Sequence, residues 1–227
     1  QAADTVIINA THTGTITIAQ ANACTILNMT ANGGTLAFGD QTLTVSGLAT
    51  LQGAMTATPA TAVLSVAGGV TLAGTPTGSF PKLTIAGAGN LTSGGFTWGG
   101  TMNLSVAGNV TLVGDWINTG LLTFTAATNL LKTAAQTYTT NGGLTMTSAS
   151  GVTGTLATII TGGTGGVWSG AGALVNPITF NCTTATISGN VAYNTGTLTY
   201  TSGTITTTSS LLSIGGSGAV ACTLDTD

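Results

Sequence analysis

Carboxylates and a histidine are the side chains with which this 227-residue sequence could do acid–base or nucleophilic chemistry. Hydrolysis requires two clustered carboxylates, or a nucleophile beside a base. His12 is the only histidine, and Asp40 and Asp115 are the only acids away from the ends of the chain. They are 75 residues apart, which is roughly three or four turns of the repeat described below. We therefore predict no catalytic residues and a non-enzymatic protein, with His12 exposed at a turn.

Cysteines and glycine pairs are the other residues that could hold a metal ion or a cofactor. Cys24, Cys182 and Cys222 lack the C-x-x-C spacing of metal sites, and their odd number leaves at least one unpaired. We interpret them as buried thiols rather than as a disulfide. The glycine pairs belong neither to a phosphate-binding loop nor to a G-G-x-G-x-D calcium repeat. The sequence therefore predicts no metal and no cofactor.

Charge limits the classes of partner. Charged side chains make up 3% of the chain, which contains no Arg and no Glu. Lys82 and Lys132 are the only cationic side chains besides His12, too few to neutralise several phosphates of a nucleic acid. Thr or Gly interrupts every apolar run after a few residues, whereas a membrane-spanning helix needs about 20 apolar residues. We therefore expect no nucleic-acid partner and no membrane span.

Three tryptophans could contact a ligand or a partner. Trp98 and Trp116 lie at the ends of repeat units, and Trp168 lies in the most glycine-dense segment. An indole at such a position can cap a core, pack against a neighbouring subunit or stack on a sugar ring. We favour packing or a subunit interface and keep a cell-surface glycan as the alternative ligand.

Thr-x-Thr pairs recur along the chain, for example at Thr15/Thr17, Thr42/Thr44 and Thr145/Thr147. Threonine suits the outward positions of a strand, and this is the simpler interpretation. Flat threonine ladders also resemble the ice-binding faces of some antifreeze proteins. Because the best repeats alternate Thr and Ser at the equivalent position, ice binding remains an alternative.

A repeated phrase sets the elements that position all these residues. Leu is followed by Val or Ile two residues later, by Gly four later and by a second Leu eight later, and the four best copies start 21, 19 and 21 residues apart. The members are Leu43, Val45, Gly47 and Leu51; Leu64, Val66, Gly68 and Leu72; Leu83, Ile85, Gly87 and Leu91; and Leu104, Val106, Gly108 and Leu112. Looser copies on both sides extend the repeat to about nine or ten units.

The phrase predicts an all-β fold, a parallel β-solenoid (β-helix) with a period near 20 residues. Stacked turns would align the first leucines in one inward column, the Val and Ile residues in a second and the later leucines in a third, with the glycines at the corner between strands. Residues 54–62 and 75–81, which carry Pro59, Pro76 and Pro81, are expected to be connecting arms. A β-sandwich or jelly roll is the alternative, since it also has many short strands.

The repeat also predicts the domain organisation. Solenoid turns are expected over residues 1–154 and again over 178–227, with a Gly-rich irregular junction at 155–177. A single continuous domain follows. An open solenoid end exposes unpaired strand edges, so at least one end is expected to dock onto another copy or another domain.

The alternating Leu-x-Val-x-Gly phrases and the abundance of Thr and Gly resemble the β-solenoid repeat regions of phage tail fibres and bacterial surface adhesins. The resemblance covers residues 14–222 and is one of style rather than of a diagnostic motif. It implies a non-enzymatic structural role in an extracellular fibre, a virion appendage or a cell-surface layer. It also implies assembly into a homo-oligomer or filament, or attachment to a surface.

Overall fold

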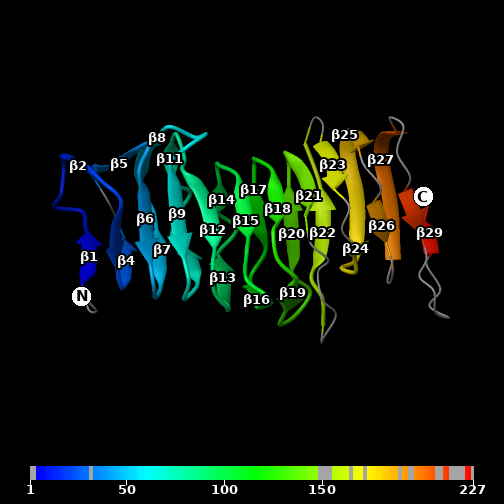
Figure 1. The fold of residues 1–227 in the computed structure, drawn as a ribbon, viewed down its shortest axis with the longest axis horizontal. Helices are drawn as coiled ribbons and strands as arrows, with labels where there is room; N and C mark the ends of the chain where they lie inside the picture. Colours follow the sequence, from blue (N-terminus) through cyan, green and yellow to red (C-terminus); the bar gives the residue numbers. More distant parts are fainter. Residues whose placement is uncertain are drawn as a thin grey trace.

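The strands of this chain wind into one elongated β-solenoid (Figure 1). The computed structural model describes residues 4–30, 33–147, 155–163, 166–170, 173–188, 191–193, 197–207, 212–214 and 223–225. Every pair of named strands in it is parallel, and the aligned residues of successive turns are 19 (Leu64 to Leu83) to 24 (Leu144 to Trp168) positions apart. The predicted all-β parallel solenoid is therefore confirmed, and the sandwich alternative is wrong because its neighbouring strands would pair antiparallel.

Each turn of the solenoid contributes one strand to each of three faces, which we call faces A, B and C. Face A holds β1 (Thr5–Ile8), β4 (Ile26–Met29), β7 (Ala49–Leu51), β10 (Val70–Leu72), β13 (Gly89–Ser93), β16 (Gly108–Val113) and β19 (Thr128–Lys132). Face B begins with β2 (Thr15–Thr17), β5 (Thr35–Gly39), β8 (Ala54–Ala57) and β11 (Thr77–Gly78), and continues with β14 (Thr97–Trp98), β17 (Trp116–Asn118), β20 (Thr137–Thr140) and β22 (Thr158–Thr161). Face C holds β3 (Asn22–Cys24), β6 (Thr42–Val45), β9 (Val63–Val66), β12 (Lys82–Ile85), β15 (Met102–Leu104), β18 (Leu122–Phe124), β21 (Gly143–Met146) and β23 (Gly166–Gly170).

Two long strands join faces B and C toward the C-terminal end. The first residues of β25 (Ile178–Ser188) pair with β22 and its last residues pair with β23, so that both faces become one sheet. The next long strand, β27 (Thr197–Thr207), pairs with β25 along both halves. The remaining strands are β24 (Ala173–Leu174), β26 (Val191–Tyr193) and β28 (Leu212–Ile214), which form a sheet of their own, and β29 (Thr223–Asp225), which pairs with β27.

Alternation of side chains explains why these segments become strands with one buried face. In β6, Leu43 and Val45 are buried while Thr44 between them is exposed, as a period of two requires. Parallel sheets are usually covered on both faces. Here threonine and serine hydroxyls hydrate the outer face without charge, while the inner faces meet in one continuous apolar core.

The third face was not predicted. Residues 54–62 and 75–81 were expected to be connecting arms, but β8 and β11 lie within them and pair with each other in face B. Met55 of β8 is fully buried, whereas Pro59 follows the strand in a turn. These strands are short and rich in small residues, so their alternation is weak in the sequence.

The inward columns of face C follow the predicted alignment over three phrases and then shift. Leu64 pairs with Leu83, but Leu83 pairs next with Met102, so that Leu104 lies opposite Ile85. The reason is that this turn spans 19 residues, whereas the phrase recurs after 21. A shift of two residues preserves the alternation, and Leu104 therefore stays buried.

The same shift places Val106 outside the predicted column. Leu104 ends β15 and completes the column of valine and isoleucine side chains, and Val106 follows the strand as a half-buried residue packed against the core. The other members of this column are buried: Val45, Val66 and Ile85.

The later leucines occupy two neighbouring columns of face A instead of one. Leu51 pairs with Leu72, whose next partner is Ser93. Leu91 instead pairs with Val70 and then with Leu112. All four leucines are buried, because the displacement is again two residues.

The glycines of the phrase lie where successive turns approach most closely. Gly47, Gly68 and Gly87 lie in the corner between face C and face A, and a Cβ atom on any of them would collide with the backbone of the preceding turn. None of the three needs a positive φ, so close approach rather than handedness selects glycine here. Gly108 differs: it is the first residue of β16, and a Cβ there would meet only a methyl group of Val106 at 3.9 Å.

The segment 155–177, predicted as an irregular junction, contains β22, β23 and β24. Face A is interrupted at this level, because β19 makes only an isolated antiparallel bridge between Leu131 and Leu156. Asn176, fully buried, donates from Nδ2 to the carbonyl oxygens of Leu130 (2.9 Å) and Ala157 (3.0 Å). One side chain thus links three successive turns where the strand ladder is missing.

Candidate functional site

The acidic residues of the middle of the chain lie at different corners of the rod. Asp40 is exposed between β5 and β6, where it accepts a hydrogen bond from Nε2 of Gln41. Asp115 is exposed between β16 and β17, and its Oδ1 accepts from the backbone nitrogen (2.8 Å) and the hydroxyl (3.2 Å) of Thr137. Asp115 therefore fixes the start of β20 in the next turn. This arrangement provides no paired carboxylates.

His12 was expected to be exposed, and the structure places it half-buried. Its backbone nitrogen donates to the carbonyl of Asn9 in a turn after β1, and its ring lies over Gly34 of the next turn. The ring atom Nε2 is buried with no hydrogen-bond partner. No acidic residue contacts this imidazole among the described interactions, so it lacks the partner that would orient a general base.

Two of the three cysteines are described, and both are buried free thiols: Cys24 and Cys182. Burial, with a smaller contribution from Asp4, raises the pKa of the Cys24 thiol. A raised pKa suppresses the thiolate, so Cys24 is a poor nucleophile. Cys222 lies outside the described residues. No group of three or more His, Cys, Asp or Glu side chains that could hold a metal ion occurs within the described part of the chain.

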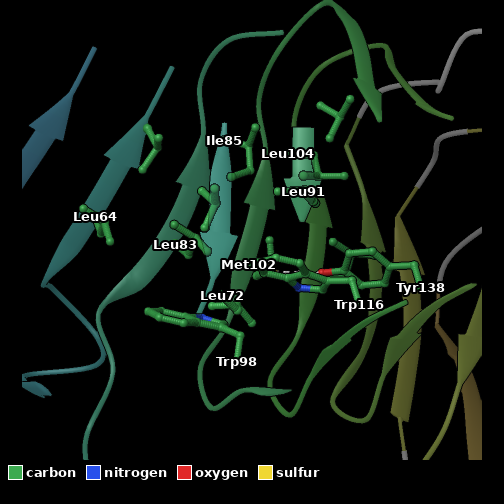
Figure 2. Packing of buried hydrophobic residues seen from close by; sticks show 14 of the residues in the cluster. Leu64, Leu72, Leu83, Ile85, Leu91, Trp98, Met102, Leu104, Trp116 and Tyr138 are labelled. Carbon is green, nitrogen blue, oxygen red and sulfur yellow. Dashed lines mark hydrogen bonds between the residues drawn. The ribbon is translucent and has the colours of Figure 1, made fainter. Parts of the chain in front are cut away.

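The three tryptophans are all buried, contrary to the expectation that they contact a glycan or a neighbouring subunit. Trp98 and Trp116 are 0% exposed and Trp168 is 1% exposed. Figure 2 shows Trp98 and Trp116 pointing inward among the leucines of the core. Trp168 packs against Phe180, with ring centroids 5.1 Å apart. A buried indole cannot stack on a sugar, and the glycan alternative therefore loses the residues on which it was based.

A polar cluster surrounds one methionine inside the core (Figure 2). The sulfur of Met102 accepts hydrogen bonds from Nε1 of Trp116 (2.9 Å) and from the hydroxyl of Tyr138 (3.0 Å). These two aromatic residues lie opposite each other in face B. Burial raises the pKa of Tyr138 well above its ordinary value. The cluster satisfies polar groups of the core, and its location away from the surface excludes contact with a substrate.

The outer surface of face C carries a continuous column of hydroxyl and amide side chains, which we call the face C column. Its aligned members are Thr44, Ser65, Thr84, Asn103, Thr123, Thr145, Ser169 and Ser188. The Thr145 and Ser169 hydroxyls are 2.9 Å apart and hydrogen-bonded between turns. The predicted Thr-x-Thr pairs do not form a second parallel column, because Thr15/Thr17 lies on face B and the position aligned with Thr42 is Val63 and then Lys82.

The first turn leaves the N-terminal end of the rod open. Among the described strands, β1 pairs only with β4, β2 only with β5 and β3 only with β6. A hollow of about 230 Å³ opens here, and apolar side chains of the first two turns line most of it. This end and the face C column are the two surfaces whose regularity sets them apart from the rest of the molecule.

None of the described residues belongs to a helix with the length and hydrophobicity of a membrane span. No protein-family model, no curated protein and no solved structure matches this chain.

Proposed function

We propose that the chain is a non-enzymatic structural rod that spaces or attaches other components within an extracellular fibre, a virion appendage or a surface layer. The observation that carries this proposal is the continuous stack of turns around a single core. In such a stack each turn adds length and each contacts only its neighbours. The property that the sequence maintains from turn to turn is thus the rod itself.

The dispersal of reactive groups supports a non-catalytic role. Asp40 and Asp115 lie at different corners, and Asp115 already binds the backbone of the next turn. Catalysis by acid and base groups requires them within hydrogen-bond reach of one substrate atom. The scarcity of charge is compatible with an exterior location, since hydroxyl ladders hydrate the surface without presenting many Lys or Arg residues to proteases.

Immunogold labelling of the intact source cells or particles tests this proposal. Antibodies raised against the recombinant rod are expected to label the exterior without permeabilisation, on a thin projection or layer. An antibody against an internal protein of the same source serves as the control and should label only permeabilised samples. Label from the anti-rod antibody that also appears only after permeabilisation would contradict the proposal.

Ice binding is a second candidate, favoured by one observation: the face C column repeats hydroxyls at the spacing of parallel strands, about 4.8 Å. Its single column is narrow, and Thr145 and Ser169 bond to each other. The test is the shape of ice crystals grown in micromolar protein, with Thr84→Lys as the disrupted variant. Faceted crystals with the native chain and round discs with T84K would favour this candidate over the rod alone.

A further inference from the structure

The open N-terminal end has the properties of a docking surface for β-strands. Each of the edge strands β1, β2 and β3 has one neighbour among the described strands, so its other edge presents backbone amides and carbonyls outward. Unpaired edges of this kind are templates for strand addition. The three edges lie on the three faces of one turn, and an occupant that satisfies all of them must itself be a solenoid turn.

Apolar side chains continue from the core into the open end. Val6 and Ile16 of the first turn are half-buried, and they line the hollow together with Leu36 and Leu43 of the second turn. A docked turn would bury Val6 and Ile16 as fully as their counterparts are buried in the middle of the rod. Such burial contributes about 25 cal/mol per Å² of apolar surface.

An exposed apolar patch adjoins this end on face A. Ile7 is 61% exposed, Ile26 39% and Leu48 44%. Ile7 is in β1, Ile26 is in β4 of the second turn, and Leu48 immediately precedes β7 of the third. Outward positions elsewhere on this face hold threonines such as Thr50 and Thr71. The patch therefore distinguishes the N-terminal end from the rest of face A.

The first turn also lacks the usual protection of edge strands. Charged side chains, prolines or a covering helix normally prevent edges from pairing with other chains. Residues 5–24 contain no Asp, Glu, Lys, Arg or Pro, and Asp4 is the one charged residue that lines the hollow. No electrostatic barrier in this turn opposes the approach of another chain.

We propose that the first turn docks onto the C-terminal end of a second copy of this chain, head to tail. The proposal rests on the rod function proposed above. The C-terminal end supplies matching elements, because β28 pairs only with β26 and β29 only with β27 among the described strands. Every pair of named strands in the chain is parallel, and only head-to-tail docking continues that direction. A head-to-head dimer would require antiparallel ladders.

Head-to-tail contacts use two different surfaces, so they do not close on themselves. Each added copy leaves one free N-terminal end and one free C-terminal end. Such a heterologous interface builds open filaments rather than closed dimers. The rod would therefore lengthen by whole copies.

Sedimentation velocity across a concentration series tests the first part of the proposal. The native chain is expected to form species of increasing mass. Val6→Lys places a charge in the hollow, where it stays hydrated while the end is open but would be buried by a docked turn. We expect V6K to weaken self-association at least tenfold. The matched control, Val113→Lys on the exposed middle of face A, should associate as the native chain does.

A mixing experiment tests the direction of docking. Fluorescently labelled V6K still has an intact C-terminal end, so it should co-sediment with excess unlabelled native chain although it does not bind itself. Failure of V6K to bind the native chain would indicate head-to-head docking and overturn the proposal. Self-association of V6K at native strength would show that the first turn is not the interface.

Two further results keep the test decisive. If circular dichroism shows that V6K is unfolded, Ile7→Lys on the exposed patch takes its place, because that side chain contributes little to the fold. A native chain that remains monomeric throughout the concentration series also overturns the proposal. Surface labelling of the source would be unaffected by that result, so the rod function and the docking surface fail separately.

Discussion

At the scale of residues, the glycines of this chain act through contact between turns. Gly87 lies at the corner between β12 and β13, and a Cβ there would collide with the carbonyl oxygen of Ala67 in the preceding turn. Gly108 has the same place in the repeated phrase but begins β16, where space for a methyl group is nearly free. Equivalent positions in the sequence therefore have different physical roles.

Replacing each of these two glycines with alanine separates the roles. Gly87→Ala forces the turns apart and should cost about 1–3 kcal/mol of unfolding free energy, as overpacking of a tight contact does. Gly108→Ala should change stability by less than about 1 kcal/mol and can increase it by restricting the unfolded chain. Urea denaturation followed by circular dichroism measures both. Equal losses in the two variants would contradict the contact between turns.

Tyr138 makes the stability of the core sensitive to alkaline pH. Burial raises the pKa of its phenol well above the ordinary value. In the unfolded chain the phenol loses its proton near pH 10, while in the folded chain it keeps it. Unfolding then releases a proton above pH 10, so this contribution is fully present below pH 10 and is lost as the pH rises further.

The variant Tyr138→Phe tests this linkage through a slope rather than an absolute stability. Between pH 10 and 11.5 the native chain should lose up to about 1.4 kcal/mol per pH unit more than Y138F does. Removal of the hydroxyl also removes its bond to Met102, which lowers stability at every pH and leaves the slope unaffected. Tyr200→Phe, at a half-buried phenol, is the matched control. Parallel pH profiles for the native chain and Y138F would refute the assignment.

At the scale of elements, Asn176 compensates for the interruption of face A. Its amide donates to Leu130 and Ala157 on two different preceding turns, where only an isolated bridge connects β19 to the chain above it. Buried carbonyls that lose their donors cost about 1–3 kcal/mol each. This side chain therefore stabilises the turn in which the strand ladder is incomplete.

Hydrogen exchange measures the contribution of this element directly. In Asn176→Ala the amide of Ala157, which donates to Leu130 at 2.9 Å, should exchange at least tenfold faster, together with neighbouring amides of β22. Amides of the distant strands β6 and β9 should keep their native rates, because a solenoid transmits contacts only between neighbours. Asn90→Ala, at an exposed position of β13, is the control. Unchanged exchange at Ala157 would remove Asn176 from this role.

The elements also show what the sequence alone could predict. Alternation and a period near 20 predicted the parallel solenoid and the burial of residues such as Leu64 and Ile85, because inward parity follows from a period of two. The alignment of Leu104 could not be predicted, since turns of unequal length move the register by two residues without changing parity. Face B was missed because strands such as β8 carry small residues that alternate weakly.

The candidate site was less predictable than the fold. Trp98 occupies a glycine-rich context typical of a surface loop, yet its indole is buried and donates to the carbonyl of Thr101 at 3.3 Å. Sequence position does not reveal the direction of a side chain at a corner. The open end, by contrast, could be anticipated in general from the solenoid. Its apolar patch required the three-dimensional alignment of Ile7, Ile26 and Leu48.

At the scale of the whole molecule, the rod is a sum of turns, and its length should change by whole turns. Stability of such a stack is approximately the sum of each turn and its contacts with two neighbours. Insertion of complete turns in register adds length and core without disturbing the ends. A closed domain with contacts distant in sequence would not tolerate the same insertion.

The measurement that tests this central claim is small-angle X-ray scattering on a chain in which residues 64–101 are duplicated in tandem. The duplication begins at Leu64 and ends just before Met102, which aligns with Leu83 and Leu64 in the register of face C. The rod should stay folded and its maximum dimension should grow by about 9–10 Å, the spacing of two parallel strands. An unfolded variant, or a folded one of unchanged length, would contradict the account.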